Sequence, residues 1–277
     1  QYIASTLLRL AVGRGFALAG KTLGVVGVGN VGRKVAAVGR ALGMKVLLND
    51  PPRARAEGAA GFNTLDEITA ESDILTFHVP LEHGGSDPTF HLVDAAFLAR
   101  LAPGRILINS SRGEVVDNGA LKQALAAKRL AAAVLDVWEN EPGIDLELLG
   151  LLDYATPHIA GYSTDGKANG TAMSVNALAE FFGLSDRLRR WYPADVPLPE
   201  LRALRCPETG IREEKLLAVV AQSYDVAQDS LRLKDWPAAF EDQRGGYPLR
   251  REFPAFTVAG GDAETREIRK KLGFTLV

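Results

Sequence analysis

The sequence predicts a doubly wound α/β domain built on a parallel sheet, followed by a smaller α+β domain. From Lys21 onward, short apolar runs alternate with amphipathic stretches, a pattern typical of strand-helix-strand units. The segment GVGNVG, residues 27–32, joins the first apolar run to the first amphipathic stretch. Four prolines fall within residues 191–210, and because proline interrupts regular structure, we expect a domain boundary near Arg190.

The apolar runs predict five strands in the first domain, over residues 23–28, 45–48, 74–77, 105–108 and 133–135. The amphipathic stretches predict helices over residues 31–42, 65–70, 94–101, 117–128 and 167–182. Asp117 is a predicted N-cap, because its side-chain oxygen can accept a hydrogen bond from a free amide of the first helical turn. An opening helix is indicated by apolar residues at helical spacing in YIASTLLRLAVG.

The residues after 190 predict a small domain that forms a homodimer. A strand is expected over residues 256–259 and a last helix ends at Gly273. One face of a further predicted helix carries Leu216, Leu217, Val220 and Tyr224. Because small domains bury little apolar surface by themselves, we expect a second copy of the chain to cover this face.

The composition is that of an ordinary globular protein. A net charge of −2, with basic and acidic residues interspersed, argues against binding to nucleic acid. No apolar run reaches the roughly 20 residues of a membrane span, so no membrane association is expected. The single cysteine, Cys206, cannot form an intrachain disulfide, which favours the cytoplasm. A targeting signal ahead of Gln1 stays an open alternative.

The glycine-rich segment predicts a dinucleotide site. Gly27, Gly29 and Gly32 follow a strand and open a helix, where backbone amides and the helix dipole can hold a pyrophosphate. Asp50 ends the second strand, where a carboxylate can bind the ribose hydroxyls and repel a 2′-phosphate. NAD is therefore the predicted cofactor. The alternative is NADP, because Arg53 and Arg55 lie close to Asp50 in the sequence.

Arg112 follows the fourth strand in INSSRGEVVD, at the edge of the sheet where ligands bind. Its guanidinium can hold a substrate carboxylate with two hydrogen bonds. The alternative is a surface arginine paired with Glu114 or Asp117. His158, in TPHIAG, can accept a hydroxyl proton, and Glu141, in ENEP, is the candidate acid that orients it. Taken singly, a histidine beside proline is more often a loop-packing residue, and ENEP alone is compatible with a solvated turn.

A metal site is a weaker interpretation. His78, His83 and His91 are spaced unlike any compact metal-ligand motif, and cysteine partners are lacking. We therefore expect no metal and take these histidines as solvated or structural side chains.

Together, the blocks GVGNVG, INSSRGEVVD, LDVWENEP and TPHIAG resemble the NAD-dependent D-2-hydroxyacid dehydrogenases over roughly residues 1–182. The resemblance implies a Rossmann domain whose catalytic residues are Arg112, Glu141 and His158. It implies that the substrate is bound by Tyr162 and Arg112, and that Asp136 holds the nicotinamide carboxamide. The implied cofactor residues are Gly27, Gly29, Asn30, Val31, Gly32, Asp50, Pro51, Val79, Pro80, Ser110, Ser111, Arg112, Asp136 and Gly161.

The segments NDPPR, ILTFHVPL and TPHIAGYSTDGKANGT, with a tail ending in KKLGF, resemble members of this family that oxidise a phosphorylated 2-hydroxy acid in vitamin B6 biosynthesis. Other dehydrogenases of the family, for phosphoglycerate or hydroxypyruvate, and a non-catalytic NAD-sensing scaffold on the same fold stay open. The expected divisions are a linking helix from a truncated substrate domain (1–16), the dinucleotide domain (17–158), a returning helix (159–189) and the dimerisation domain (190–277).

Overall fold

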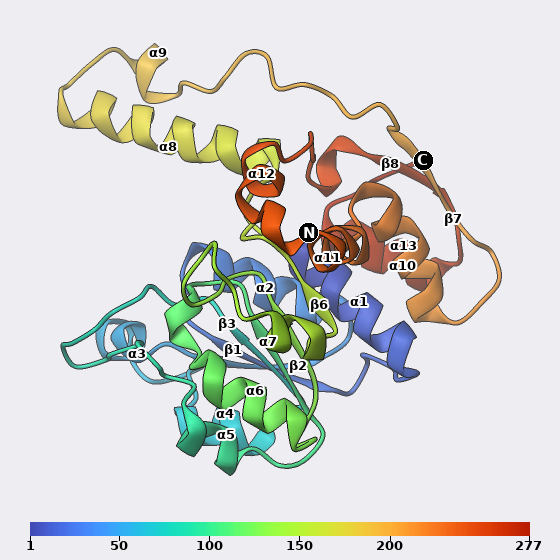
Figure 1. Cartoon of the computed structure of the whole chain (residues 1–277). Helices are drawn as coiled ribbons and strands as arrows, with labels where there is room; N and C mark the ends of the chain where they lie inside the picture. Colours follow the sequence, from blue (N-terminus) through green and yellow to red (C-terminus); the bar gives the residue numbers. More distant parts are fainter.

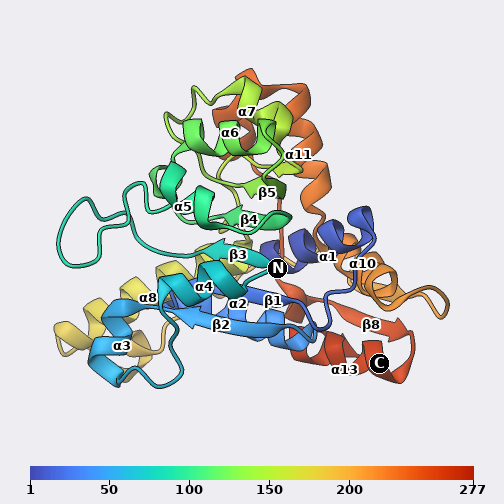
Figure 2. The same cartoon turned by 90° about the horizontal axis from the view of Figure 1, so that it is seen from below.

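The computed structural model describes residues 1–277 and contains a six-stranded parallel sheet in the order β2-β1-β3-β4-β5-β6. The strands are β1 (Thr22–Val26), β2 (Lys45–Asn49), β3 (Ile74–Phe77), β4 (Arg105–Asn109), β5 (Leu130–Leu135) and β6 (Tyr154–Ala155). The labels of β2, β1, β3, β4 and β5 follow one another across the sheet in Figure 2. Since β2 and β3 lie on opposite sides of β1, the strand order reverses there, and ligands bind at the carboxyl ends of strands beside such a reversal.

Helices cover both faces of this sheet. They are α1 (Tyr2–Arg14), α2 (Asn30–Ala41), α3 (Pro51–Glu57), α4 (Leu65–Glu71), α5 (Ala95–Arg100), the 3₁₀ turn η1 (Gly113–Val115), α6 (Asn118–Ala126) and α7 (Leu146–Leu151). Alternate residues of β4 face two different cores: Ile106 and Ile108 pack in the core that contains α1 and α2, and Leu107 in the core that contains α5 and α6. Strands buried on both faces explain the continuous apolar runs in the sequence.

The predicted fold class is confirmed, and all five predicted strands of this sheet are present. Asp117 is an N-cap as predicted, since its carboxylate accepts a hydrogen bond from the amide of Ala120 at 2.9 Å. The sequence did not reveal β6, which has only two residues, or α3, which buries no side chain and so has no apolar periodicity. Both are short elements whose positions depend on their neighbours in space.

The carboxyl-terminal region contains a second, three-stranded parallel sheet in the order β7-β8-β9. Its elements are β7 (Ala203–Cys206), α10 (Arg212–Ser223), α11 (Val226–Asp235), η2 (Pro237–Ala239), α12 (Phe240–Gly245), η3 (Phe253–Ala255), β8 (Thr257–Gly260), α13 (Ala263–Leu272) and β9 (Thr275–Leu276). The proline-rich stretch over residues 191–202 contains no helix or strand. The last helix is followed by Gly273 in a left-handed conformation with φ of 101°, which is a common helix terminator.

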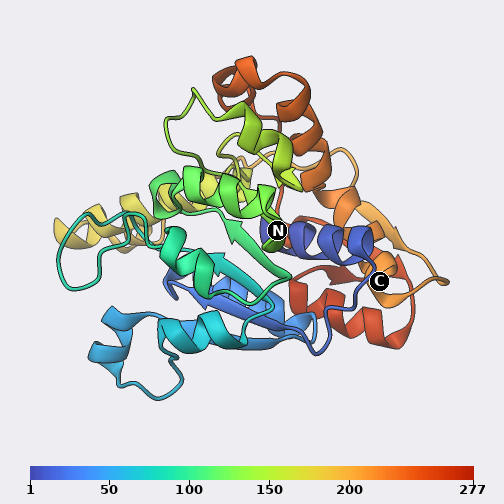
Figure 3. The same cartoon turned by 60° about the horizontal axis from the view of Figure 1, so that its bottom comes forward.

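The apolar face of α10 is covered by α1 of the same chain. Leu216 and Val220 are each 1% exposed and share a core with Leu7. Figure 3 shows α1, in dark blue, between the sheet and the orange and red elements of the carboxyl-terminal region. The hydroxyl of Ser5 accepts a hydrogen bond from the amide of Val226 at 3.0 Å. The expectation that this helix face needs a second copy is therefore wrong, because α1 buries it within one chain.

Helix α8 (Thr164–Phe181) and the short α9 (Asp186–Arg189) extend away from the body of the molecule (Figure 1). Met173 and Phe181 of α8 are 62% and 82% exposed. Among the helices of this structure, none combines the length and the apolar composition that crossing a lipid bilayer requires.

Candidate active site

Every predicted site segment follows the carboxyl end of a strand of the large sheet. The glycine loop, Asp50 and the loop that begins at His78 follow β1, β2 and β3, and we call these three segments the cofactor half. Arg112, Glu141 and His158 follow β4, β5 and β6, and we call these three residues and their loops the catalytic half. Because parallel strands end at one edge, segments more than a hundred residues apart in the sequence come together there.

Each of the three positions in the loop is a glycine for a different physical reason. Gly27 has φ of 86°, and a Cβ on it would lie 2.5 Å from the carbonyl oxygen of His78. A Cβ on Gly32 would lie 1.9 Å from the carbonyl oxygen of Gly27, so this glycine lets α2 start directly against the loop. A Cβ on Gly29 would meet no protein atom within 4 Å. Packing does not require Gly29, which points to close approach by a ligand at that position.

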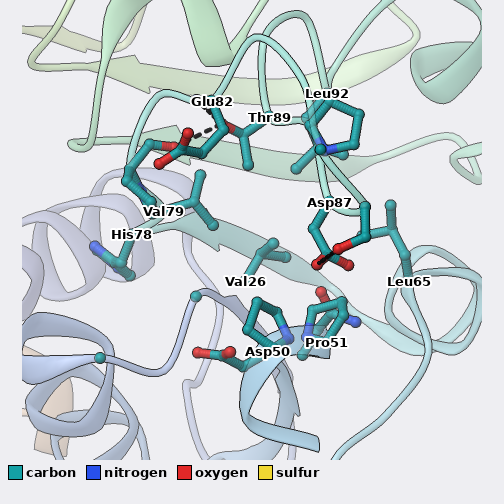
Figure 4. A pocket seen from close by; sticks show the side chains of 18 of the residues that line it. Val26, Asp50, Pro51, Leu65, His78, Val79, Glu82, Asp87, Thr89 and Leu92 are labelled. Carbon is teal, nitrogen blue, oxygen red and sulfur yellow. Dashed lines mark hydrogen bonds between the residues drawn. The ribbon is translucent and has the colours of Figure 1, made fainter. Parts of the chain in front are cut away.

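A cavity of about 600 Å³ lies beside the glycine loop. Figure 4 shows Asp50 and Pro51 below this cavity and Thr89 and Leu92 above it. Its wall includes six of the predicted cofactor residues, namely Gly27, Gly29, Asp50, Pro51, Val79 and Pro80. The others lie along the same sheet edge: Asn30, Val31 and Gly32 begin α2, Ser110, Ser111 and Arg112 follow β4, Asp136 follows β5, and Gly161 follows His158.

Asp50 is fixed by hydrogen bonds at the end of β2. Its carboxylate accepts from the amide of Val28 in the glycine loop at 2.8 Å and from the amide of Arg53 at 3.1 Å. The guanidinium of Arg53 donates to Glu57 at 2.7 Å and to the carbonyl oxygen of Val28 at 2.6 Å. Arg53 is thus engaged by its own helix and by the glycine loop.

Arg55 is also engaged, in an ion pair with Asp87 of the loop after β3. Asp87 lines the cavity, so this ion pair joins α3 to the opposite wall. Neither arginine that favoured NADP in the sequence is therefore free of an acidic partner.

His158 and Glu141 form the central pair of the catalytic half. The His158 Nδ1 lies 2.8 Å from the Glu141 Oε2, and the other carboxylate oxygen of Glu141 accepts from the amide of Trp138 at 2.9 Å. His158 has φ of 56°. Both side chains are partly exposed, so the free face of the imidazole can meet a substrate. The predicted orientation of His158 by Glu141 has the required geometry.

Asp136 anchors the loop that carries His158. Only 1% of Asp136 is exposed, and its carboxylate accepts from the amides of Ile159 at 2.8 Å and Ala160 at 2.9 Å and from the hydroxyl of Thr156 at 2.6 Å. Burial raises the pKa of Asp136, although these three hydrogen bonds act in the opposite direction. Asp136 therefore contacts the backbone on both oxygens, and its proposed contact with a carboxamide stays a prediction.

Arg112 is exposed and forms no ion pair in this structure. The one hydrogen bond of its guanidinium runs to the carbonyl oxygen of Ser111 at 2.7 Å. Neither Glu114 nor Asp117 pairs with it, so the surface-pair alternative from the sequence is wrong. An unpaired guanidinium on the same sheet edge as His158 is available to an anionic ligand.

The three histidines of the loop after β3 have separate partners. In the structure, no three histidine, cysteine or acidic side chains come together to hold a metal ion. The His78 Nε2 lies 2.9 Å from the hydroxyl of Thr76, and burial lowers the pKa of His78 to about 4. His91 pairs with Glu139, and His83 packs against Phe90.

Residues 9–160 match the family model described as D-isomer specific 2-hydroxyacid dehydrogenase, NAD binding domain. The chain belongs to this family. Residues 196–273 match a second model, described only as a domain of unknown function. Since the family model is that of an NAD-binding domain and the loop, cavity and Asp50 fit such a group, the cofactor of this dehydrogenase is NAD.

Similarity to proteins of known name and structure supports the family assignment. The chain is 48% identical to erythronate-4-phosphate dehydrogenase of Bacteroides fragilis over 258 residues, which is 93% of this chain and 71% of the relative. It is 43% identical to the enzyme of that name from Cronobacter sakazakii, over 99% of this chain and 72% of the relative. The structure of Aquifex aeolicus D-lactate dehydrogenase, complexed with NAD and lactic acid, is similar with a TM-score of 0.52, 28% identity and coverage of 70% and 66% of the two chains.

Sequence reasoning missed a junction within the dehydrogenase site. The His91 Nε2 lies 2.6 Å from the Glu139 Oε1, and the His91 amide donates to the carbonyl oxygen of Glu114 at 2.7 Å. The other oxygen of Glu139 accepts from the amide of Asn118 at 2.8 Å. A Cβ on Gly113 would lie 1.9 Å from the carbonyl oxygen of Trp138. The loop after β3, the turn after Arg112 and the segment before Glu141 are therefore held together.

The carboxyl-terminal region also reaches this dehydrogenase site. The buried Arg250 donates to the carbonyl oxygens of Ile159 at 3.0 Å and Ala160 at 2.7 Å, directly after His158. Tyr247 packs edge-on against Tyr162, with ring centroids 6.1 Å apart. No sequence motif marks these residues. The contact arises because the loop that carries Tyr247 and Arg250 folds back onto the His158 loop.

Proposed function

We propose that this dehydrogenase oxidises 4-phospho-D-erythronate to 3-hydroxy-2-oxo-4-phosphooxybutanoate with NAD, as a step of pyridoxal phosphate biosynthesis. The pairing of His158 with Glu141 beside an unpaired Arg112 supports a 2-hydroxyacid oxidation. The names of relatives that share 42–48% of the sequence over most of the chain support this substrate.

The imidazole supplies the proton acceptor. Because Glu141 takes the Nδ1–H of His158, the Nε2 of the ring carries the lone pair and faces away from the acid. In oxidation, Nε2 accepts the proton of the C2 hydroxyl, and the resulting imidazolium is stabilised by the carboxylate of Glu141. In reduction, the same atom returns the proton to the carbonyl oxygen.

Arg112 binds and orients the substrate carboxylate. A guanidinium can donate two parallel hydrogen bonds to a carboxylate, which fixes the plane of C1 and the position of C2. Holding C2 in place is a large part of the rate enhancement, since correct orientation removes much of the entropy cost of the reaction.

When bound, NAD would supply the acceptor for the hydride that leaves C2. The residues that would hold it are the glycine loop through its backbone amides, Asp50 on the adenosine ribose, and Val79 and Pro80 on the opposite wall of the cavity. The open position at Gly29 fits the passage of a pyrophosphate.

A homodimer through residues 190–277 in the cytoplasm is part of this proposal. Since α10 is covered by α1, the remaining apolar surface of this region is the better candidate interface. Leu231 and Trp236 of the α11 end are 56% and 72% exposed and lie together around one hollow. Replacing both by serine should convert a dimer into a monomer in light scattering, and an unchanged mass would exclude this surface.

Substrate profiling with NAD tests the function. We expect turnover with 4-phospho-D-erythronate that exceeds turnover with 3-phospho-D-glycerate or with the hydroxy acid corresponding to hydroxypyruvate. A preference for either of these would favour the alternative dehydrogenases. Binding of NAD without turnover of any of the three would favour the sensing scaffold.

A further inference from the structure

Two cationic side chains lie against the ring of Tyr162, and they come from different parts of the chain. The Lys167 Nζ, in the first turns of α8, lies 4.4 Å from the ring centroid. The Arg244 Cζ, on α12 of the carboxyl-terminal region, lies 5.9 Å from the same centroid. Tyr162 follows His158 by four residues, so both cations stand beside the catalytic half.

These two cations lack strong acidic partners. Lys167 forms no ion pair, and Arg244 reaches only Glu241, one turn earlier on its own helix, at 3.5 Å. The Nε of Arg244 is buried and has no hydrogen-bond partner in the protein. A buried donor without a partner is costly, so its satisfaction by a ligand is favourable.

Neighbouring arginines of the same region behave differently. Arg251 donates two hydrogen bonds to Asp165, at 2.8 and 2.9 Å, and Arg250 is used on the carbonyl oxygens after His158. Around Tyr162, Lys167 and Arg244 are therefore available to a ligand, and so is Arg112 on the sheet edge that carries His158. A site with separate unpaired cations suits a ligand with two anionic groups.

The position of helix α12 relative to the catalytic half is fixed by the loop that follows it. Arg250 and Tyr247, in the loop that follows α12, contact the segment between His158 and Tyr162. Burial lowers the pKa of Arg244, but Tyr162 and the carboxylates of Glu241 and Glu141 raise it by more. Through its contact with the Tyr162 ring, Arg244 lies beside the segment that follows His158.

We propose that Arg244 and Lys167 form a second anion subsite, which takes the phosphate group of the substrate while Arg112 takes its carboxylate. The region that matches a domain of unknown function then has a role in substrate recognition within its own chain. This inference rests on the proposed function, because that function supplies a substrate with an anionic group at each end.

Equilibrium binding to the NADH-loaded protein tests the subsite without turnover. Dissociation constants are measured for 4-phospho-D-erythronate and for D-erythronate, which lacks the phosphate. We expect Arg244→Gln to weaken the phosphorylated ligand by about 10- to 100-fold, as for loss of a hydrogen bond to a charged group, and D-erythronate by less than about twofold. Equal weakening of both ligands, or of neither, would overturn the subsite.

Two further variants show whether a loss of binding comes from a folding defect or from loss of the subsite. Lys167 is exposed, so Lys167→Gln should leave the melting temperature unchanged and still weaken the phosphorylated ligand selectively. Arg266→Gln, on the exposed face of α13, is the matched control and should change neither dissociation constant. If Lys167→Gln acted on both ligands alike, Lys167 would not belong to a phosphate subsite.

The wild-type protein separates this inference from the proposed function. If it bound 4-phospho-D-erythronate no better than D-erythronate, the assignment of a phosphorylated substrate would fail. If it preferred the phosphorylated ligand and Arg244→Gln kept the same preference, the substrate class would stand and only the subsite would be wrong.

Discussion

The cofactor half and the catalytic half share one sheet edge but are assembled differently. The cofactor half uses residues between 27 and 92, and its main contacts run between neighbouring loops, such as the Asp50 carboxylate on the Val28 amide. The catalytic half is held by contacts across the whole chain, from His91 on Glu139 to Arg250 on the carbonyl oxygens after His158. The geometry of the cofactor half therefore depends on local backbone structure, and the geometry of the catalytic half depends on the carboxyl-terminal region.

The largest expected effect lies in the catalytic half. His158→Ala removes the proton acceptor, so we expect kcat to fall by about 10²- to 10⁴-fold, the usual range for a general base. The dissociation constant of NAD should stay unchanged, because His158 does not line the cavity. Steady-state kinetics and NAD titration measure the two quantities. The exposed His83→Ala is the matched control, and near-normal turnover of His158→Ala would remove this residue from the mechanism.

Arg250 tests the dependence of the catalytic half on the distant region. Arg250→Met frees the carbonyl oxygens of Ile159 and Ala160, so the His158 loop loses its support. A misplacement of about 1 Å can cost about 10²-fold in rate, and we expect a loss of that order in kcat with little change in NAD affinity. An equal loss of NAD affinity would show that the two halves are not separable.

The glycines test the cofactor half. Gly32→Ala should weaken NAD and also lower the melting temperature, because its Cβ would overlap the carbonyl oxygen of Gly27. Gly29→Ala should weaken NAD by about tenfold or more without lowering the melting temperature, since no protein atom lies within 4 Å of its Cβ. Gly150→Ala, also in open space, is the control. Unchanged NAD binding by Gly29→Ala would contradict the reason given for that glycine.

Asp50 should decide the choice between the two dinucleotides. Asp50→Ala removes the carboxylate that would bind the ribose hydroxyls and repel a 2′-phosphate. We therefore expect the affinity for NAD to fall by about tenfold and the affinity for NADP to fall by less. Adding Glu57→Gln releases Arg53 from its acidic partner and should raise the affinity for NADP further. Titration of both cofactors measures this shift, and equal weakening of NAD and NADP by Asp50→Ala would count against the ribose contact.

The last prediction concerns stability and leaves both halves of the site intact: it is the pH dependence of stability from His78. Its folded-state pKa is about 4, below the ordinary value of 6.5, because burial disfavours its charged form. Below pH 6.5 the unfolded chain therefore binds a proton that the folded chain does not, and stability falls as the pH drops from 6.5 to 4, by about 3 kcal/mol. Urea unfolding of His78→Gln should show a shallower decline over this window. A decline as steep as that of the parent would assign it to other groups.

Local patterns in the sequence were enough for much of this protein. Glycines next to a strand and a helix, an acid after the second strand, and apolar runs of strand length each depend on residues close together in the chain. For that reason the parallel sheet, the NAD loop and the Asp117 N-cap were predictable. The resemblance of the four spaced blocks to a known family predicted Arg112, Glu141 and His158 as a set, and in the structure all three follow strands that end at one edge of the sheet.

Only the tertiary structure decided how the carboxyl-terminal region is used. The apolar face of α10 indicated a partner, but it could not indicate that α1 of the same chain is that partner. Contacts such as His91 with Glu139 or Arg250 with the His158 loop join residues 48 and about 90 positions apart, without any periodic signal. Such contacts arise from the packing of whole elements, and packing between distant elements leaves no local pattern from which it can be predicted.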